Sequence, residues 1–148
     1  MKDYEYWMKI AIEEAIIAFE EDEVPVGAVL VKNDKLILRN HNRTKQLSNP
    51  LAHAEKLIIE EILSQGKIFL YDYKLFVTLE PCLMCSGMIV WSRLGEIVFG
   101  AYDKKAGCVG SIYNVLKDRN FNHHPKITNN VLAEESAELL RRFFQKKR

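Results

Sequence analysis

The chain has 148 residues, of which 48% are hydrophobic, and its formal net charge is +1. This length predicts one domain, residues 1–148, with enough apolar material for a core. The sequence lacks the roughly 18–20-residue apolar stretch of a membrane helix and the apolar run of a secretory signal. We therefore expect a cytoplasmic protein with no membrane partner, in which the three cysteines bind metal or lie buried as thiols.

The spacing of apolar residues and turn signals predicts alternating helices and strands along the chain. Helices are predicted over residues 3–20, 52–63, 112–116 and 132–144, and Pro81 is predicted to open a further helix. Strands are predicted over residues 26–31, 36–39, 75–79 and 96–99, with an edge strand at 126–128. This order favours an α/β fold with three layers (α/β/α), in which a mixed sheet of about five strands has helices on both faces.

The small net charge hides an uneven distribution along the chain. Residues 1–100 carry 11 Lys and Arg against 15 Asp and Glu, a balance of −4, whereas residues 101–148 carry 10 against 5, a balance of +5. The basic residues of the end of the chain are Arg141, Arg142, Lys146, Lys147 and Arg148. Such a stretch can contact phosphates or can simply solvate the end of a helix, and charge alone leaves both interpretations open.

Two short motifs supply the ligand types of a catalytic zinc site. His53 is followed two residues later by Glu55, and Pro81 begins a Cys-x-x-Cys that contains Cys82 and Cys85. Catalytic zinc takes three protein ligands and keeps a fourth position for water. We therefore predict one Zn²⁺ per chain at His53, Cys82 and Cys85, with Glu55 left over as the catalytic residue that moves protons. The arrangement matches the known His-x-Glu…Pro-Cys-x-x-Cys signature of zinc deaminases.

Three other interpretations of these motifs are weaker. A redox pair is disfavoured because the proline precedes the first cysteine instead of lying between the two. A structural zinc would need a fourth ligand, such as Cys108, His41 or a distant histidine. Glu55 could also be an ordinary solvated helix residue, as most glutamates are.

At these motifs the chain resembles the cytidine-deaminase superfamily, and specifically the bacterial tRNA adenosine deaminases of the TadA type. The matching runs span nearly the whole chain and are residues 23–31, 52–55, 78–85, 100–103, 110–111, 121–123 and 131–135. The two catalytic runs are shared by the wider superfamily. The remaining runs, together with the paired phenylalanines before a basic tail, narrow the resemblance to the tRNA enzymes.

The resemblance implies a cytidine-deaminase-like fold and a homodimer that converts the wobble adenosine of a tRNA anticodon to inosine. The implied partner is therefore a tRNA anticodon stem-loop. Asn42, the backbone amide of Ala54 and Asp103 match substrate-binding positions of the family. The chain departs from the family pattern at Asn49 and Leu51, where an aspartate and a small threonine-like residue are common.

Two alternative functions remain open at this point. One is deamination of a free base or nucleotide, such as guanine, cytosine or deoxycytidylate. His53, in place of a cysteine, argues against the small cytidine deaminases but not against the guanine or deoxycytidylate types. The other is a non-catalytic, zinc-stabilised RNA-binding subunit, which Glu55 disfavours because a structural site has no use for a proton carrier.

Overall fold

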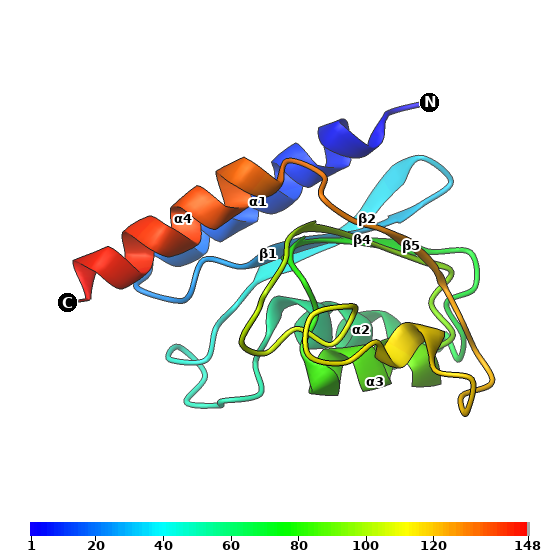
Figure 1. Ribbon diagram of the computed structural model, residues 1–148. Coiled ribbons are helices and arrows are strands. Elements are labelled where there is room, and N and C mark those ends of the chain that lie inside the picture. The colour runs from blue at the N-terminus through cyan, green and yellow to red at the C-terminus, as the bar shows by residue number, and fades with distance from the viewer. Residues whose placement is uncertain (148) are drawn as a thin grey trace.

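The computed structural model, which describes residues 1–147, has a five-stranded sheet with helices on both faces (Figure 1). In chain order the elements are α1 (Tyr4–Glu20), β1 (Gly27–Lys32), β2 (Lys35–His41), α2 (Ala54–Ser64), β3 (Lys74–Leu79), α3 (Leu83–Trp91), β4 (Glu96–Ala101), η1 (Val115–Lys117), β5 (Lys126–Thr128) and α4 (Ala133–Lys146). The predicted mixed α/β/α architecture is confirmed. Within residues 1–147, none of the helices combines the length and the apolar character that a membrane crossing requires.

The directions of the strands place the carboxyl ends of several strands at one edge of the sheet. The strand order is β2-β1-β3-β4-β5, with β1 antiparallel to both neighbours and β3, β4 and β5 parallel. The carboxyl ends of β2, β3 and β4 therefore share an edge, from which residues 42–53, 80–82 and 102–114 emerge. Ligands of open α/β sheets usually bind at such an edge.

Two apolar clusters hold the layers together. Helices α1 and α4 lie side by side over one face of the sheet, and α2 and α3 cover the other (Figure 1). Successive strand side chains point to opposite faces, so Ala28 and Leu30 of β1 join the cluster under α2 and α3, while Val29 and Val31 join the cluster under α1. A Cβ on Gly27 would lie 2.0 Å from the carbonyl oxygen of Ala11, so only glycine permits this approach of α1 to β1.

Several element boundaries differ from the predictions for local reasons. Helices α2 and α3 each begin two residues later than predicted, because His53 and Cys82 keep extended backbones as the N-cap residues. Pro81 therefore precedes the N-cap, instead of occupying the first turn as predicted. The predicted helix at 112–116 was also wrong: residues 112 and 113 are not helical, Asn114 forms an isolated β-bridge with Val109, and the three-residue 3₁₀ helix η1 begins at Val115.

Candidate active site

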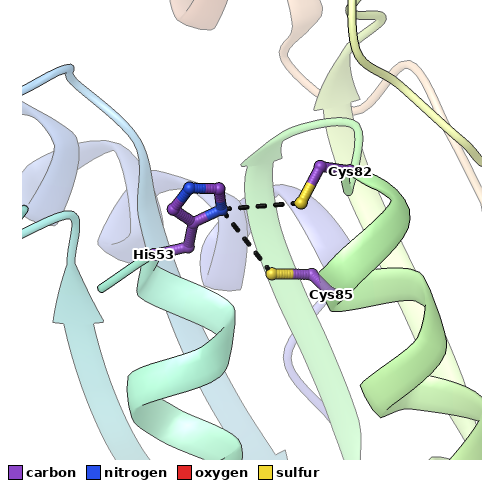
Figure 2. A group of neighbouring side chains, drawn as sticks. All are labelled: His53, Cys82 and Cys85. Atoms are coloured by element: carbon purple, nitrogen blue, oxygen red, sulfur yellow. Dashed lines mark hydrogen bonds between the residues drawn. The ribbon is translucent and has the colours of Figure 1, made fainter. Parts of the chain in front are cut away.

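Three side chains from two helix starts form a metal-binding group. His53 and Cys82 are the N-cap residues of α2 and α3, and Cys85 lies in the first turn of α3. Figure 2 shows the imidazole of His53 directed at both sulfurs, with Nδ1 3.5 Å from the Sγ atom of Cys82 and 3.8 Å from that of Cys85. The three ligand atoms lie within 4.8 Å of one another. The structure thus brings together the three predicted ligands, which lie up to 32 residues apart in sequence.

The donor set and its spacing fit zinc. Typical zinc–sulfur and zinc–nitrogen bonds of about 2.3 and 2.0 Å at a tetrahedral angle place nitrogen and sulfur about 3.5 Å apart. The two Nδ1–Sγ distances, 3.5 and 3.8 Å, lie close to that value. The partial positive charge of both helix starts also favours thiolates at this point.

The ligands already polarise one another. The hydrogen bonds from Cys85 and His53 lower the pKa of the Cys82 thiol to about 4, so Cys82 is a thiolate at neutral pH. The same contact with Cys82, together with burial, raises the pKa of Cys85 above its ordinary range. The hydrogen bond with Cys82 also raises the pKa of His53. Cys85 must therefore lose its proton when a metal binds.

Glu55 lies beside this group but is not part of the metal-binding set. Its side chain is buried, with 4% of its surface exposed, in the first turn of α2. Burial raises its pKa to about 7. A carboxyl group with a pKa close to neutrality can both accept and return a proton, which is the property that a general acid–base catalyst needs.

A cavity of about 230 Å³ contains the site and brings the predicted substrate contacts together. It is lined by His53, Glu55 and Cys82, and also by Asn42 and Asp103. Asn42 follows β2 and Asp103 follows β4, so the shared edge of the sheet explains their convergence. The backbone N–H of Ala54 donates to Oδ1 of Asn42 at 2.8 Å, so two predicted contacts bond to each other.

Asn49 and Leu51, the two departures from the family pattern, shape the loop between β2 and α2. Oδ1 of Asn49 accepts a hydrogen bond from the backbone N–H of Leu51 at 2.9 Å, and the side chain of Leu51 is exposed. Neither residue is among those that line the cavity in the described chain. Their effect therefore falls on the loop and not on the reacting groups.

Two buried glutamates that are not among the predicted site residues hold the loops around this cavity. Glu23 accepts hydrogen bonds from the hydroxyl of Thr44 and from the backbone N–H groups of Lys45 and Gln46, at 2.8–3.2 Å. Glu80 accepts from the segment that follows β4. Both residues fall inside the family-like runs 23–31 and 78–85, which was the only signal available in the sequence.

In the structure, His41 and Cys108, two candidates for a fourth protein ligand, bond to other groups. Both ring nitrogens of His41 lie 2.7 Å from carboxylate oxygens, Nδ1 from Glu14 and Nε2 from Glu21. The thiol of Cys108 donates to the carbonyl oxygen of Ala106. In the described chain, neither residue belongs to the metal-binding group. Three protein ligands are typical of catalytic zinc, whereas structural zinc usually takes four.

The basic C-terminal segment lies beside the loop that follows β2. Lys147 pairs with Asp22, and Asp22 also pairs with Lys45 of that loop.

The other basic residues of the segment contact neighbouring side chains. The cationic groups of Arg142 and Lys146 lie 5.6 and 5.2 Å from the ring centre of Phe19, and Arg141 pairs with Glu138. Arg148 lies outside the described residues.

Comparison with known proteins agrees with this geometry. A family model of the cytidine and deoxycytidylate deaminase zinc-binding region matches residues 1–101. The chain belongs to this deaminase family. Within the family, it is 45% identical over 149 aligned positions to a tRNA-specific adenosine deaminase of Bacillus subtilis (strain 168), covering 100% of this chain and 92% of that one.

Two further relatives extend the match. A tRNA-specific adenosine deaminase of Aquifex aeolicus (strain VF5) is 46% identical over 145 positions, covering 97% of this chain and 95% of that one. A solved structure from work on A-to-I editing by tRNA:A34 deaminases superposes with a TM-score of 0.86 at 39% identity, covering 91% of this chain and 99% of that chain. The predicted resemblance to the tRNA-acting deaminases is confirmed, and zinc is the metal of this deaminase family.

Proposed function

We propose that this protein is a zinc-dependent hydrolase that converts the wobble adenosine of a tRNA anticodon to inosine. The observation that carries the chemistry is one cavity containing a three-ligand zinc group and a buried carboxyl group that is not a ligand. The full-length similarity to tRNA-specific adenosine deaminases supports the substrate. We propose that the single domain of residues 1–148 suffices for this reaction.

In the proposed mechanism, the side chains of the protein move the protons. His53, Cys82 and Cys85 would hold zinc, which would lower the pKa of water toward neutrality and so supply a nucleophile. Glu55 takes the proton of the attacking water and delivers it to ring N1, which makes C6 electrophilic. After hydroxide has added to C6, Glu55 takes the proton of the new C6 hydroxyl group and carries it to the departing amine. The C6–N bond breaks and the C6 carbonyl forms, so that adenine and water give hypoxanthine and ammonia.

We assign the orientation of the base to the residues around the mouth of the cavity. Because the N–H of Ala54 occupies Oδ1 of Asn42, the side-chain NH₂ of Asn42 is the group left to donate to a ring acceptor. Asp103 is proposed to contact a nucleotide next to the target. We propose an indirect role for Ala54, because its backbone N–H donates to Asn42 and so fixes the orientation of the Asn42 side chain.

The size of the site and the charge beside it suit a nucleotide displaced from an RNA loop. A base buried in a duplex cannot reach a cavity of this kind, whereas a nucleotide in an anticodon loop can be flipped out at lower cost. The basic C-terminal segment, which lies next to the loop after β2, is proposed to contact phosphates of the anticodon stem. We propose a cytoplasmic location, which a tRNA substrate supports.

We further propose that the enzyme is a homodimer that associates through α3. Leu83 and Trp91 of this helix are 60% and 79% exposed, and with Phe121 they line a hollow of about 430 Å³. Exposed apolar patches of this kind usually mark interaction surfaces. Light scattering should give twice the mass of the chain, and Trp91→Glu should give a monomer that retains zinc.

Ammonia release separates the proposed function from its alternatives. The zinc-loaded protein should release ammonia from an anticodon stem-loop RNA with a wobble adenosine, and not from guanine, cytosine or deoxycytidylate. Release from a free base or nucleotide alone would favour the small-substrate deaminases. Binding of the stem-loop without ammonia from any substrate would favour the non-catalytic RNA-binding subunit.

A further inference from the structure

Glu80 is a buried carboxylate in the wall of the active-site cavity that the proposed mechanism does not use. It is 2% exposed, and it directly follows β3, two residues before the zinc ligand Cys82. Its backbone N–H donates to the carbonyl oxygen of Ala101 at the end of β4. Glu80 therefore links the end of β3, which leads to the metal ligands, to the end of β4, which leads to Asp103.

Hydrogen-bond donors from the segment 103–111 occupy the acceptor positions of the Glu80 carboxylate. Oε1 accepts from the backbone N–H of Asp103 at 2.9 Å and from the hydroxyl of Ser111. Oε2 accepts from the backbone N–H groups of Val109 and Ser111, at 2.9 and 3.0 Å. An ionised carboxylate offers about four acceptor positions, so four donors satisfy it, and bonds to a charged acceptor are roughly twice as strong as neutral ones.

The path of the same segment leaves no space around this carboxylate. A Cβ on Gly107 would lie 2.2 Å from the carboxyl carbon of Glu80, so the backbone there is in direct contact with the charged group. The N–H of Cys108 donates to the carbonyl oxygen of Pro81 at 2.9 Å, next to Cys82 in the chain. The segment 103–111 is thus attached at several points to the two residues that precede the metal ligand.

We propose that Glu80 is a positioning residue that fixes the segment 103–111 against the zinc-ligand segment and so sets the place of Asp103 relative to the reacting groups. The substrate role of Asp103 rests on the proposed function, but the attachment itself does not. Glu80 is not part of the metal-binding group of the described chain, and donors from the loop take up its acceptor positions, so it acts through the loop. Its loss should therefore weaken the alignment of the RNA without removing zinc.

The variant Glu80→Gln tests the proposal with little change of volume. Glutamine replaces one acceptor oxygen by an NH₂ group, which must face either the pair of donors at Oε1 or the pair at Oε2. Amide exchange followed by NMR should speed up by roughly tenfold or more at residues 103, 109 and 111, since a buried bond to a charged acceptor is lost. The zinc content should stay at the wild-type level.

Glu96→Gln provides a matched control. Glu96 is 5% exposed and accepts from the hydroxyl groups of Tyr4 and Thr128, at the opposite end of β4 from the site. This variant should lose stability but leave exchange at residues 103, 109 and 111 unchanged. Equal acceleration at these amides in both variants would overturn the proposal, because it would reflect general loosening of the fold.

Steady-state kinetics of the variants test whether Glu80 acts through Asp103. With an anticodon stem-loop RNA, Glu80→Gln should raise KM by about tenfold and change kcat by less than about threefold, as expected for lost binding. The double variant Glu80→Gln with Asp103→Ala should resemble the worse single variant, since both remove the same contact. Multiplied effects on kcat/KM, or a fall in kcat alone, would overturn the proposal.

Gly107→Ala keeps the proposal testable if Glu80→Gln does not fold. The added methyl group must displace the Glu80 carboxylate, so it should reproduce the accelerated exchange at residues 103, 109 and 111. Unchanged exchange in that variant would count against the attachment. If the wild-type protein deaminates no RNA, the proposed function fails, while the exchange measurements still decide whether Glu80 holds the loop.

Discussion

Replacing Glu55 with glutamine removes the proposed proton carrier while it preserves the shape of the side chain. The titratable side chains that line the cavity are His53, Glu55, Glu80, Cys82 and Asp103. Two of these are proposed metal ligands, and Glu80 is saturated by four donors. Oδ1 of Asp103 already accepts from two backbone amides of its own loop.

The cavity wall therefore offers little to substitute for Glu55, and the loss should lie in the upper half of the usual range for general acid–base catalysis. We expect Glu55→Gln to lower the rate of the chemical step by about 10³-fold or more, or about 4 kcal/mol of transition-state stabilisation. Zinc should remain bound, because Glu55 is outside the metal-binding group.

Single-turnover deamination of an anticodon stem-loop RNA measures this step, with zinc quantified by mass spectrometry in the same samples. Glu61→Gln is the matched control, since it makes the same chemical change on the exposed side of the same helix and should leave the rate unchanged. A zinc-loaded Glu55→Gln enzyme within tenfold of wild type would refute the proposed proton transfer. Loss of zinc in this variant would instead assign Glu55 to the metal site.

Four other perturbations have defined outcomes. Cys85→Ser should lose zinc and much of the stability that the metal contributes, and full zinc occupancy in a Cys82 and Cys85 double substitution would show that these are not the ligands. Zinc uptake by the metal-free protein should release protons, because Cys85 has a raised pKa and must ionise; calorimetry in two buffers measures the number. Truncation after Phe144 should weaken binding of all tRNAs and reduce the salt dependence by roughly 0.7–0.9 log units per lost phosphate contact, whereas an unchanged salt dependence would leave the basic segment as a solvated helix end. His41→Ala should lower the free energy of unfolding in urea by about 1–3 kcal/mol, because one buried oxygen of Glu14 loses its hydrogen-bond partner while Arg39 still pairs with the other, and a change near zero would contradict this contact.

The zinc group was predictable from the sequence because its residue types are rare in the chain. With three cysteines and four histidines in total, a Cys-x-x-Cys and a His-x-Glu leave few possible ligand sets. The order of helices and strands was predictable because helical spacing of apolar residues marks α1, while short continuous apolar runs mark buried strands such as β1 and β4. The helix starts at His53 and Cys82 were misplaced because an N-cap residue is defined by its backbone conformation.

The loop attachments were not predictable from sequence. Glu80 bonds to backbone groups 23–31 residues away, and any residue type carries a backbone N–H, so the donors have no sequence signature. The sequence also left His41 open as a possible metal ligand, because the hydrogen-bond partners of its ring have no sequence signature. Only the packing of α1 against the sheet reveals that Glu14 and Glu21 occupy both of its ring nitrogens.

Mass spectrometry of a tRNA with a wobble adenosine, incubated with the zinc-loaded protein, tests the proposed deamination at its product. We expect inosine at the wobble position, with the other adenosines of the tRNA unchanged, and no inosine when the Glu55→Gln protein is used. Unchanged adenosine at the wobble position, in a sample that releases ammonia from guanine or deoxycytidylate, would contradict it.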